Sequence, residues 1–454
     1  MLAKSTVAVV TIAATAIASA HPEQGQDTAP PMRTIEYIER YAPSIIPDRI
    51  VLTWAEDPKT SQTITWRTST EVTAGFVEYA AAQHGPGFLT STERVPAESE
   101  PFRTDISTSH THRATLRNLT PGGTYVYRVG DGTNWTEWYQ FTTEPLTTEP
   151  FSFVYFGDSQ NDVRSMWSRV TREAFRDAPR AAFFLHAGDL VNFARRDGEW
   201  GEWFEAGDFI NAIIPVVAVP GNHEYAKVEG PDGQERREIT PHFSRVFTFP
   251  TNGPSGLEDS VFYIDYADVR LICLNSNERQ QEQAAWLDSV LSSSDKKWNI
   301  LTFHHPIFNM AEGRNNEPLR RAWKPIIDRH DVDIVLNGHD HTYGRSDLVM
   351  AGEGLPMVNS PETSRNMRDA SGTVYVVSVS GPKMYKAKDD LPIDVERRAE
   401  DTQLYQVITI DNNELRFEAR TALGVLYDAF TIRKAPGRPN ELMNQRPDRP
   451  EIRR

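Results

Sequence analysis

The apolar residues of this chain follow two spacings, which divide it into regions of different structure. Between residues 48 and 144, short runs of β-branched and aromatic residues alternate with polar ones and are separated by turn residues, for example at 50–54, 63–67 and 75–79. Alternation of this kind is typical of strands with one buried face. Residues 48–144 are therefore predicted to form a small all-β sandwich.

From residue 150 onward the chain alternates between apolar strands and amphipathic helices. Apolar runs predict strands at 151–156, 181–185, 215–219, 269–274, 298–303 and 333–337, and helical spacing predicts helices at 163–178, 281–292 and 317–329. Further strands are predicted at 373–380, 404–410, 414–420 and 426–433. Buried strands that alternate with helices are typical of a layered α/β core. We therefore expect one α/β domain over 150–435.

The two ends of the chain differ from these regions. Lys4 precedes an apolar run that ends in Ala18-Ser19-Ala20, the pattern of a signal peptide cleaved after Ala20. A membrane anchor is the alternative, but the run is short and rich in Ala and Thr. Residues 1–20 thus predict a secreted or periplasmic protein without stable membrane insertion. Residues 21–47 are predicted to be an arm or linker, and the Pro- and Arg-rich residues 436–454 a disordered tail.

The charge of the chain limits its partners. Lys and Arg total 48 against 63 Asp and Glu, so the formal net charge is −15. The resulting field repels polyanions and argues against tracking along nucleic acid. A small phosphate ester is still allowed where metal ions supply local positive charge. The single cysteine, Cys273, excludes a disulfide within the chain and a Cys-based zinc cluster.

Polar side chains that can bind metals follow five of the predicted strands. In open α/β sheets, ligands gather just beyond the carboxyl ends of the strands. Carboxylate, amide and imidazole groups together suit divalent or trivalent metals. The pattern predicts a two-metal site, with one Asp able to bridge both ions. The six residues are Asp158, Asp189, Asn222, His304, His339 and His341.

Five short motifs follow these strands: Gly157-Asp158, Gly188-Asp189, Gly221-Asn222-His223-Glu224, His304-His305-Pro306 and Gly338-His339-Asp340-His341. In type and order they resemble the signature blocks of the calcineurin-like metallophosphoesterase superfamily. The preceding sandwich, and the Thr-Tyr-x-Arg run after the last motif, resemble the purple acid phosphatase branch. The resemblance implies a layered β-sandwich flanked by helices, with a separate N-terminal domain like fibronectin type III, in which a tyrosine near the turn in residues 119–129 anchors a sheet corner.

The resemblance also implies roles for individual residues. One metal would be bound by Asp158, Asp189 and His341, and the other by Asp189, Asn222, His304 and His339, so that Asp189 bridges. His223, and with it Asn222, would contact the substrate. His223 would protonate the leaving group or stabilise the transition state. From the sequence itself, Arg314 is a candidate phosphate contact in the loop after His304.

The chain departs from the family pattern at two positions. Purple acid phosphatases have a metal-binding tyrosine three residues after the bridging Asp, where this chain has Asn192. No tyrosinate colour is therefore expected. Other branches have Asp-x-His at the first motif, where this chain has Asp158-Ser159-Gln160. Either Gln160 or Asn192 could complete the first metal site, and Fe, Mn and Zn all remain candidates for the ions.

The function that the motifs predict is an exported hydrolase. We expect a metal-dependent phosphatase, similar to acid phosphatases, that cleaves phosphomonoesters by attack of a metal-bound hydroxide on phosphorus. A phosphodiesterase or nucleotide pyrophosphatase with the same metals is the first alternative. A secreted binding protein with a degenerate site is the second, because Gln160 and Asn192 depart from the pattern.

Overall fold

The computed structural model describes residues 35–355 and 371–453. The predicted signal peptide, residues 1–20, lies outside these ranges. The N-terminal domain consists of two four-stranded sheets that enclose a core of their own. One sheet has the order β1 (Asp48–Thr53), β2 (Gln62–Ser69), β6 (Thr108–Leu116), β5 (Glu98–Arg103). The other has the order β4 (Glu93–Pro96), β3 (Phe76–Ala81), β7 (Thr124–Gly130), β8 (Tyr139–Thr142).

The tyrosine predicted to anchor a corner of this sandwich does so. The backbone N–H of Thr120 donates to the hydroxyl of Tyr125 at 2.8 Å, and the Tyr125 ring stacks on Phe141. The bond joins the turn before β7 to the strand itself. The sandwich is thereby closed at the end where the chain enters β7.

The second domain contains two sheets of seven strands each within the described residues. The first has the order β11 (Val216–Ala218), β10 (Phe184–His186), β9 (Phe151–Phe156), β21 (Leu404–Asp411), β22 (Glu414–Thr421), β23 (Leu426–Ala435), β24 (Arg438–Asn444). The second has the order β14 (Phe262–Tyr266), β15 (Val269–Cys273), β16 (Trp298–Thr302), β17 (Ile334–Asn337), β19 (Thr373–Val377), β18 (Tyr343–Val349), β20 (Val395–Ala399).

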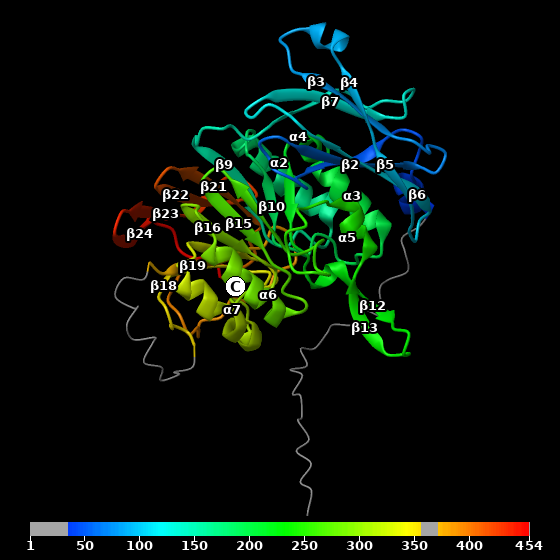
Figure 1. The fold of residues 1–454 in the computed structure, drawn as a ribbon. Coiled ribbons are helices and arrows are strands. Elements are labelled where there is room, and N and C mark those ends of the chain that lie inside the picture. The colour runs from blue at the N-terminus through cyan, green and yellow to red at the C-terminus, as the bar shows by residue number, and fades with distance from the viewer. Residues whose placement is uncertain (1–34, 356–370, 454) are drawn as a thin grey trace, which may run out of the picture.

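Both faces of the central strands β15, β16, β17 and β19 are buried, which explains their largely apolar sequences. Leu271 and Ile300 face the core between the two sheets, whereas their neighbours Ile272 and Leu301 face the core under the helices. The helices on that side are α6 (Gln280–Ser292) and α7 (Glu317–Arg329). Figure 1 shows them on the side of the molecule away from the N-terminal domain.

The first sheet is covered by helices on the side of the N-terminal domain (Figure 1). Trp167, Trp200 and Trp203 are fully buried there. The predicted helix at 163–178 is present, but its first turn, Val163–Trp167, is a π-helix. The helices are α2 (Ser168–Asp177), α3 (Asp197–Gly207), α4 (Phe209–Ile213) and α5 (Pro241–Val246). A hairpin of β12 (Tyr225–Glu229) and β13 (Glu235–Ile239) projects from the domain.

One prediction about the chain ends is wrong. The tail predicted to be disordered, 436–454, contains β24, which pairs antiparallel with β23. The predicted arm or linker contains a short helix, α1 (Ile35–Tyr41), whose Tyr41 hydroxyl donates to Glu205 of α3 at 2.8 Å. Hydrogen bonds to neighbouring elements thus hold both of these segments in place.

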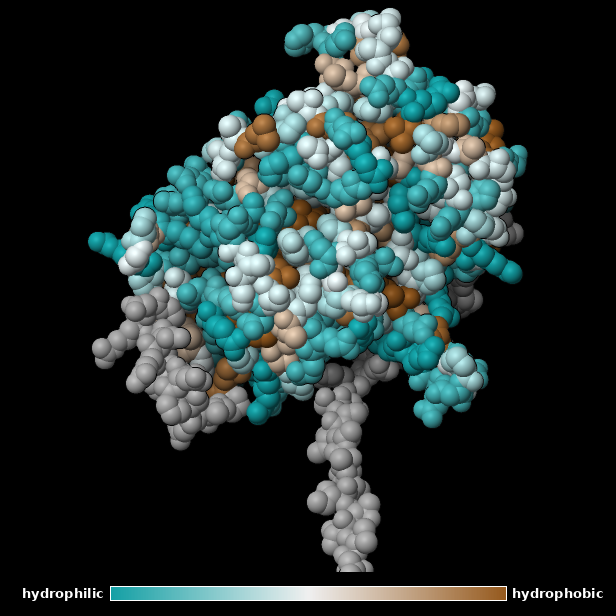
Figure 2. All heavy atoms as spheres, viewed as in Figure 1, coloured by the Kyte–Doolittle hydropathy of each residue, from teal (hydrophilic) through white to brown (hydrophobic). Residues whose placement is uncertain are grey.

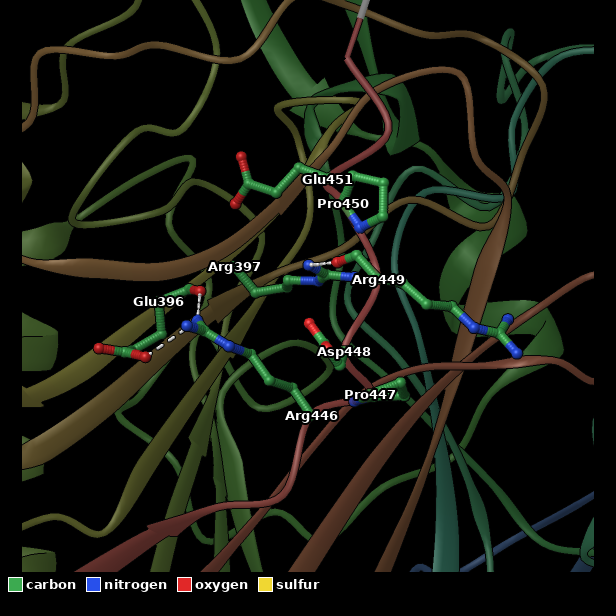
Figure 3. Close-up of a pocket in the computed structure, with 8 residues that line it drawn as sticks. All are labelled: Glu396, Arg397, Arg446, Pro447, Asp448, Arg449, Pro450 and Glu451. Carbon is green, nitrogen blue, oxygen red and sulfur yellow. Dashed lines mark hydrogen bonds and ion pairs between the residues drawn. The ribbon is translucent and has the colours of Figure 1, made fainter.

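The chain after β24 lies against β20. Arg446 donates to Oε2 of Glu396 at 3.0 Å, and Arg397 donates to the carbonyl of Arg449 at 2.7 Å (Figure 3). A cavity of about 460 Å³ lies between the two segments. None of the predicted site residues lines it.

The surface agrees with the acidic, polar composition. The face in Figure 2 is mostly hydrophilic, and its apolar side chains lie in small separate groups. No helix in the described part of the chain is long and apolar enough to span a membrane.

A buried ion cluster joins the two domains. Asp197, at the start of α3, accepts from Arg49 at 2.6 Å and from Arg67 at 3.1 Å, and both arginines belong to the N-terminal domain. Asp197 is 2% exposed. Burial alone would raise the pKa of this carboxyl, but the two guanidinium groups hold it below its usual value. The carboxylate thus stays ionised and holds the two domains together.

We predict that Asp197→Ala destabilises the protein, because it leaves two buried cations without their shared anion. Loss of one partner of a buried pair costs about 3 kcal/mol or more in free energy of unfolding. Denaturant unfolding would measure the change. Glu56→Ala is the control, since Glu56 pairs with Arg117 on the surface and its loss should leave the midpoint nearly unchanged. Equal effects of the two variants would contradict the prediction.

Candidate metal centre

The strand ends of both sheets bring the six predicted ligands to one place. Asp158, Asp189 and Asn222 follow β9, β10 and β11, which run parallel and in register. His304 follows β16, and His339 and His341 follow β17, the parallel neighbour of β16. Each sheet therefore presents its ligands at the carboxyl ends of its parallel strands.

The two sheets meet at this same edge. Asp158 forms a parallel β-bridge with Val379, just after β19 of the other sheet. The side chain of Asp158 then crosses to the second sheet and accepts the backbone N–H of His339 at 2.5 Å. This junction joins the two sets of ligands into one cluster.

Glycines make the close approach possible. A Cβ at Gly221 would lie 2.1 Å from Oδ1 of Asp189, and a Cβ at Gly338 would lie 2.3 Å from Oδ1 of Asp158. A side chain at either position would displace a carboxylate. The ligands themselves adopt unusual backbone conformations, with φ of 52° at Asp189, 73° at His339 and 49° at His341. Strain of this kind clusters at functional sites.

The first predicted set of ligands is in contact. Nε2 of His341 lies 3.2 Å from Oδ2 of Asp158. The Gln160 amide nitrogen lies 3.0 Å from both Oδ2 of Asp189 and Nε2 of His341. Gln160 is fully buried and its Oε1 has no hydrogen-bond partner among the described residues. A half-turn of the amide would direct that oxygen toward the cluster, the orientation needed by a metal ligand.

The second predicted set is in contact as well. Nε2 of His304 lies 3.1 Å from Oδ2 of Asp189 and 3.1 Å from Oδ1 of Asn222. Nδ1 of His339 lies 3.0 Å from the same Asn222 oxygen. Oδ2 of Asp189 therefore belongs to both sets, as a bridging carboxylate requires.

The imidazoles are oriented by their other nitrogen atoms. Nδ1 of His304 is 2.9 Å from the carbonyl of Ala187, and Nδ1 of His341 is 3.0 Å from the carbonyl of Lys383. A proton on each Nδ1 would be donated to a carbonyl, which leaves each Nε2 lone pair directed at the cluster. This arrangement is usual around metal-binding histidines.

Burial and mutual charge shift the pKa values of these groups. Burial raises the pKa of Asp158 to about 7, aided by the negative charge of Asp189. Burial lowers the pKa of His304, but Asp189 and Asp158 outweigh it and raise the pKa to about 9. Burial lowers the pKa of His339 and His341 well below the usual value. Two buried carboxylates and several imidazole lone pairs converge without enough donors, and this set fits cations.

His223 lies beside the cluster, as predicted. Its backbone N–H donates to Oδ1 of Asp189 at 2.8 Å, and its Nδ1 lies 2.6 Å from the carbonyl of Asn192. Its Nε2 lies 4.0 Å from Oδ2 of Asp189. Asn192 thus contacts the site through its backbone, by orienting His223, whereas Gln160 enters the cluster with its side chain.

Other residues near the cluster have structural contacts. Arg314 donates to the carbonyl of His339 and lies 3.5 Å from Oδ1 of Asp340, so the predicted phosphate contact already has acceptors. The carboxylate of Asp340 accepts the backbone N–H groups of residues 310 and 311. His186 is enclosed by Phe156, Trp167 and Trp203 and makes no hydrogen bond among the described residues.

One residue of the site was missed by sequence reasoning. Glu224 is fully buried, and its carboxylate accepts the backbone N–H groups of Asp189, Leu190 and Gly221 at 2.8, 2.9 and 2.7 Å. It therefore ties the loop after β10 to the loop after β11. The signal was the acidic residue at the end of the Gly-Asn-His-Glu motif. Its partners are backbone groups, which a motif does not reveal.

Comparison with known families agrees with this geometry. Residues 47–143 match the purple acid phosphatase N-terminal domain, and residues 151–343 match the calcineurin-like phosphoesterases. The N-terminal domain is therefore similar to that of purple acid phosphatases, and the second domain is similar to calcineurin-like phosphoesterases. These matches agree with the predicted resemblance, and the predicted fold class is confirmed. The family implies divalent metal ions, and the donor set described above fits them.

Several relatives share this architecture. An uncharacterized Mycobacterium tuberculosis protein is 26% identical, covering 81% of this chain and 74% of that protein. Purple acid phosphatase 1 of Ipomoea batatas is 28% identical, covering 60% of this chain and 58% of that protein. A probable inactive purple acid phosphatase 1 of Arabidopsis thaliana is 24% identical, covering 71% and 57%. The structure of purple acid phosphatase PPD1 from yellow lupin (Lupinus luteus) matches with a TM-score of 0.68 at 20% identity, covering 86% of this chain and 75% of that one.

We predict that Glu224→Gln weakens metal binding in this protein. The amide has one acceptor oxygen in place of two, and its NH₂ group would face backbone donors. Loss of such an outer contact lowers metal affinity by about tenfold to a hundredfold. Metal titration of the folded variant would measure it, with circular dichroism as the test of folding. Glu229→Gln, on the exposed β12, is the control, and an affinity equal to that control would contradict the prediction.

Proposed function

We propose that this chain is an exported phosphatase that uses two metal ions to hydrolyse small phosphomonoesters. The observation that supports it most is the position of Oδ2 of Asp189, within 3.1 Å of groups from both predicted ligand sets. When bound, the two ions would hold the phosphoryl oxygens and lower the pKa of an attacking water. Asp158, Gln160 and His341 would hold one ion, and Asn222, His304 and His339 the other, with Asp189 between them.

The remaining chemistry belongs to residues beside the ions. Nδ1 of His223 is fixed by the Asn192 carbonyl, so the ring can present Nε2 to the substrate. From there His223 would donate a hydrogen bond to the phosphoryl group or protonate the leaving alkoxide. Asn222 precedes His223 in the same loop, and its amide oxygen, which lies 3.0 Å from Nδ1 of His339, would bind the second metal.

We predict that two variants separate metal binding from proton transfer. Asp189→Asn should abolish release of phosphate from p-nitrophenyl phosphate, because the bridging charge is lost. His223→Ala should retain metal but lose about a hundredfold or more in kcat. Both would be assayed with Mn, Fe or Zn supplied, beside elemental analysis of each protein. Asp232→Asn makes the same change in the exposed turn of the β12–β13 hairpin and should not alter the rate.

Three outcomes would contradict this proposal. Full activity of Asp189→Asn would show that the cluster does not perform the chemistry. Hydrolysis of bis(p-nitrophenyl) phosphate or of a nucleotide, but not of a monoester, would favour the phosphodiesterase alternative. A wild-type protein that binds metal without turning over any of these esters would favour the binding-protein alternative.

The proposal of export rests on residues 1–20 alone. Lys4, the apolar run and Ala18-Ser19-Ala20 have the order of a signal peptide. We predict that the mature protein begins at His21 and is recovered outside the cytoplasm. N-terminal sequencing and fractionation of the expressing cells would measure this. A full-length protein retained in the cytoplasm would contradict it.

A further inference from the structure

The loop at residues 381–385, after β19, is fastened to the metal centre. The backbone N–H of Gly381 donates to the carbonyl of Asp158 at 2.6 Å, and that of Tyr385 donates to the carbonyl of His341 at 2.9 Å. The carbonyl of Lys383 is the acceptor at 3.0 Å from Nδ1 of His341. Because three backbone contacts join it to two metal-ligand positions, the loop holds its side chains at fixed places beside the cluster.

Two cationic side chains lie beside an aromatic ring of this loop. Tyr385 packs edge-on against His341, with ring centroids 4.9 Å apart. Nζ of Lys383 lies 5.6 Å from the centroid of Tyr385, and Cζ of Arg314 lies 5.0 Å from it. Cations are attracted to aromatic rings at such distances. Tyr385 therefore holds two cations next to a metal ligand.

The two cations differ in what neutralises them. Arg314 has the carbonyl of His339 and the carboxylate of Asp340 as acceptors. Lys383 is half-buried, and no carboxylate of the described residues lies within ion-pairing distance of it. The Tyr385 ring that the Lys383 ammonium faces also packs against His341, so this ammonium is held on a ring that contacts a predicted metal ligand.

Charge balance shows what an unneutralised cation here would do. Two divalent ions would bring four positive charges to the site. The carboxylates of Asp158 and Asp189 and a hydroxide would neutralise three of them, which leaves one positive charge. A phosphodiester monoanion would neutralise that remaining charge. A phosphomonoester dianion would leave one negative charge over, which is costly in a buried site unless a cation faces it. Of the two cations beside the Tyr385 ring, Lys383 is the one with no carboxylate partner among the described residues.

We propose that Lys383 binds the second negative charge of a phosphomonoester and thereby makes monoesters preferred over diesters. Tyr385 positions the ammonium, and the backbone contacts of residues 381–385 fix the ring. The inference rests on the proposed phosphatase function and adds to it a residue that selects the substrate class.

The test compares Lys383→Met with Lys386→Met, an exposed lysine of the same segment. The ratio of kcat/KM for p-nitrophenyl phosphate to that for bis(p-nitrophenyl) phosphate should fall roughly tenfold in Lys383→Met, mainly through KM for the monoester. The ratio should be unchanged in Lys386→Met. It should stay close to the wild-type value in Lys383→Arg, which keeps the positive charge. The proposal would be overturned if Lys383→Met lowered kcat/KM equally for both esters, or if Lys386→Met lowered the ratio as much as Lys383→Met does.

A binding measurement separates this inference from the proposed activity. Calorimetric titration of metal-loaded protein with inorganic phosphate should show weaker binding to Lys383→Met by a factor similar to the change in KM. If the wild type cleaves neither ester, the phosphatase proposal fails, while the phosphate titration still tests Lys383. Equal phosphate affinity of the wild type and Lys383→Met would overturn the role of Lys383.

Discussion

Two buried carboxylates, Asp158 and Asp189, impose the constraint on which the rest of this structure depends. Each is at most 1% exposed, and charges at such depth need positive partners or cations. Imidazoles surround them, His304 and His341 above all, with one nitrogen on a backbone carbonyl and the other directed at the carboxylates. At the edge where the two sheets meet, carboxylate oxygens and imidazole nitrogens, which can accept hydrogen bonds or bind cations, therefore lie close together. Stable folding around such a set is favoured when cations bind to it.

The scaffold explains how the acceptors can come so close. Parallel strands deliver their carboxyl ends to one edge, and the Asp158–Val379 bridge joins the edges of the two sheets. Glu224 then fastens the loops after β10 and β11 through their backbone N–H groups. The N-terminal domain is attached by a separate device, the ion cluster of Asp197, at the start of α3. Metal centre and domain junction thus depend on different buried anions.

The sequence predicted the buried strands of this protein correctly, but not the structure of its C-terminal tail or the contacts of Arg314. The strands at 151–156 and 298–303 were predictable because most of their residues are apolar and buried on both faces. The tail at 436–454 was not, since β24 exists by pairing with β23, and its composition gives no sign of that partner. Arg314 was placed near the cluster, but its acceptors lie on a loop far away in sequence. Local sequence patterns therefore predict individual strands and helices. Contacts between residues far apart in sequence decide the pairing of the tail and the hydrogen-bond partners of Arg314.

The sequence by itself indicated the family resemblance, the fold class and the six residues that the structure brings together, because metal binding demands particular side chains at fixed places after strands. Only the tertiary structure decided that Asp189 faces both ligand sets, that Gln160 enters the cluster while Asn192 contributes its carbonyl, and that Glu224 binds the loops together. It also brought Lys383 to the cluster from a loop with no motif. The physical reason is that charge balance and hydrogen bonding act through space, and the backbone groups that take part in these contacts have no signature in the sequence.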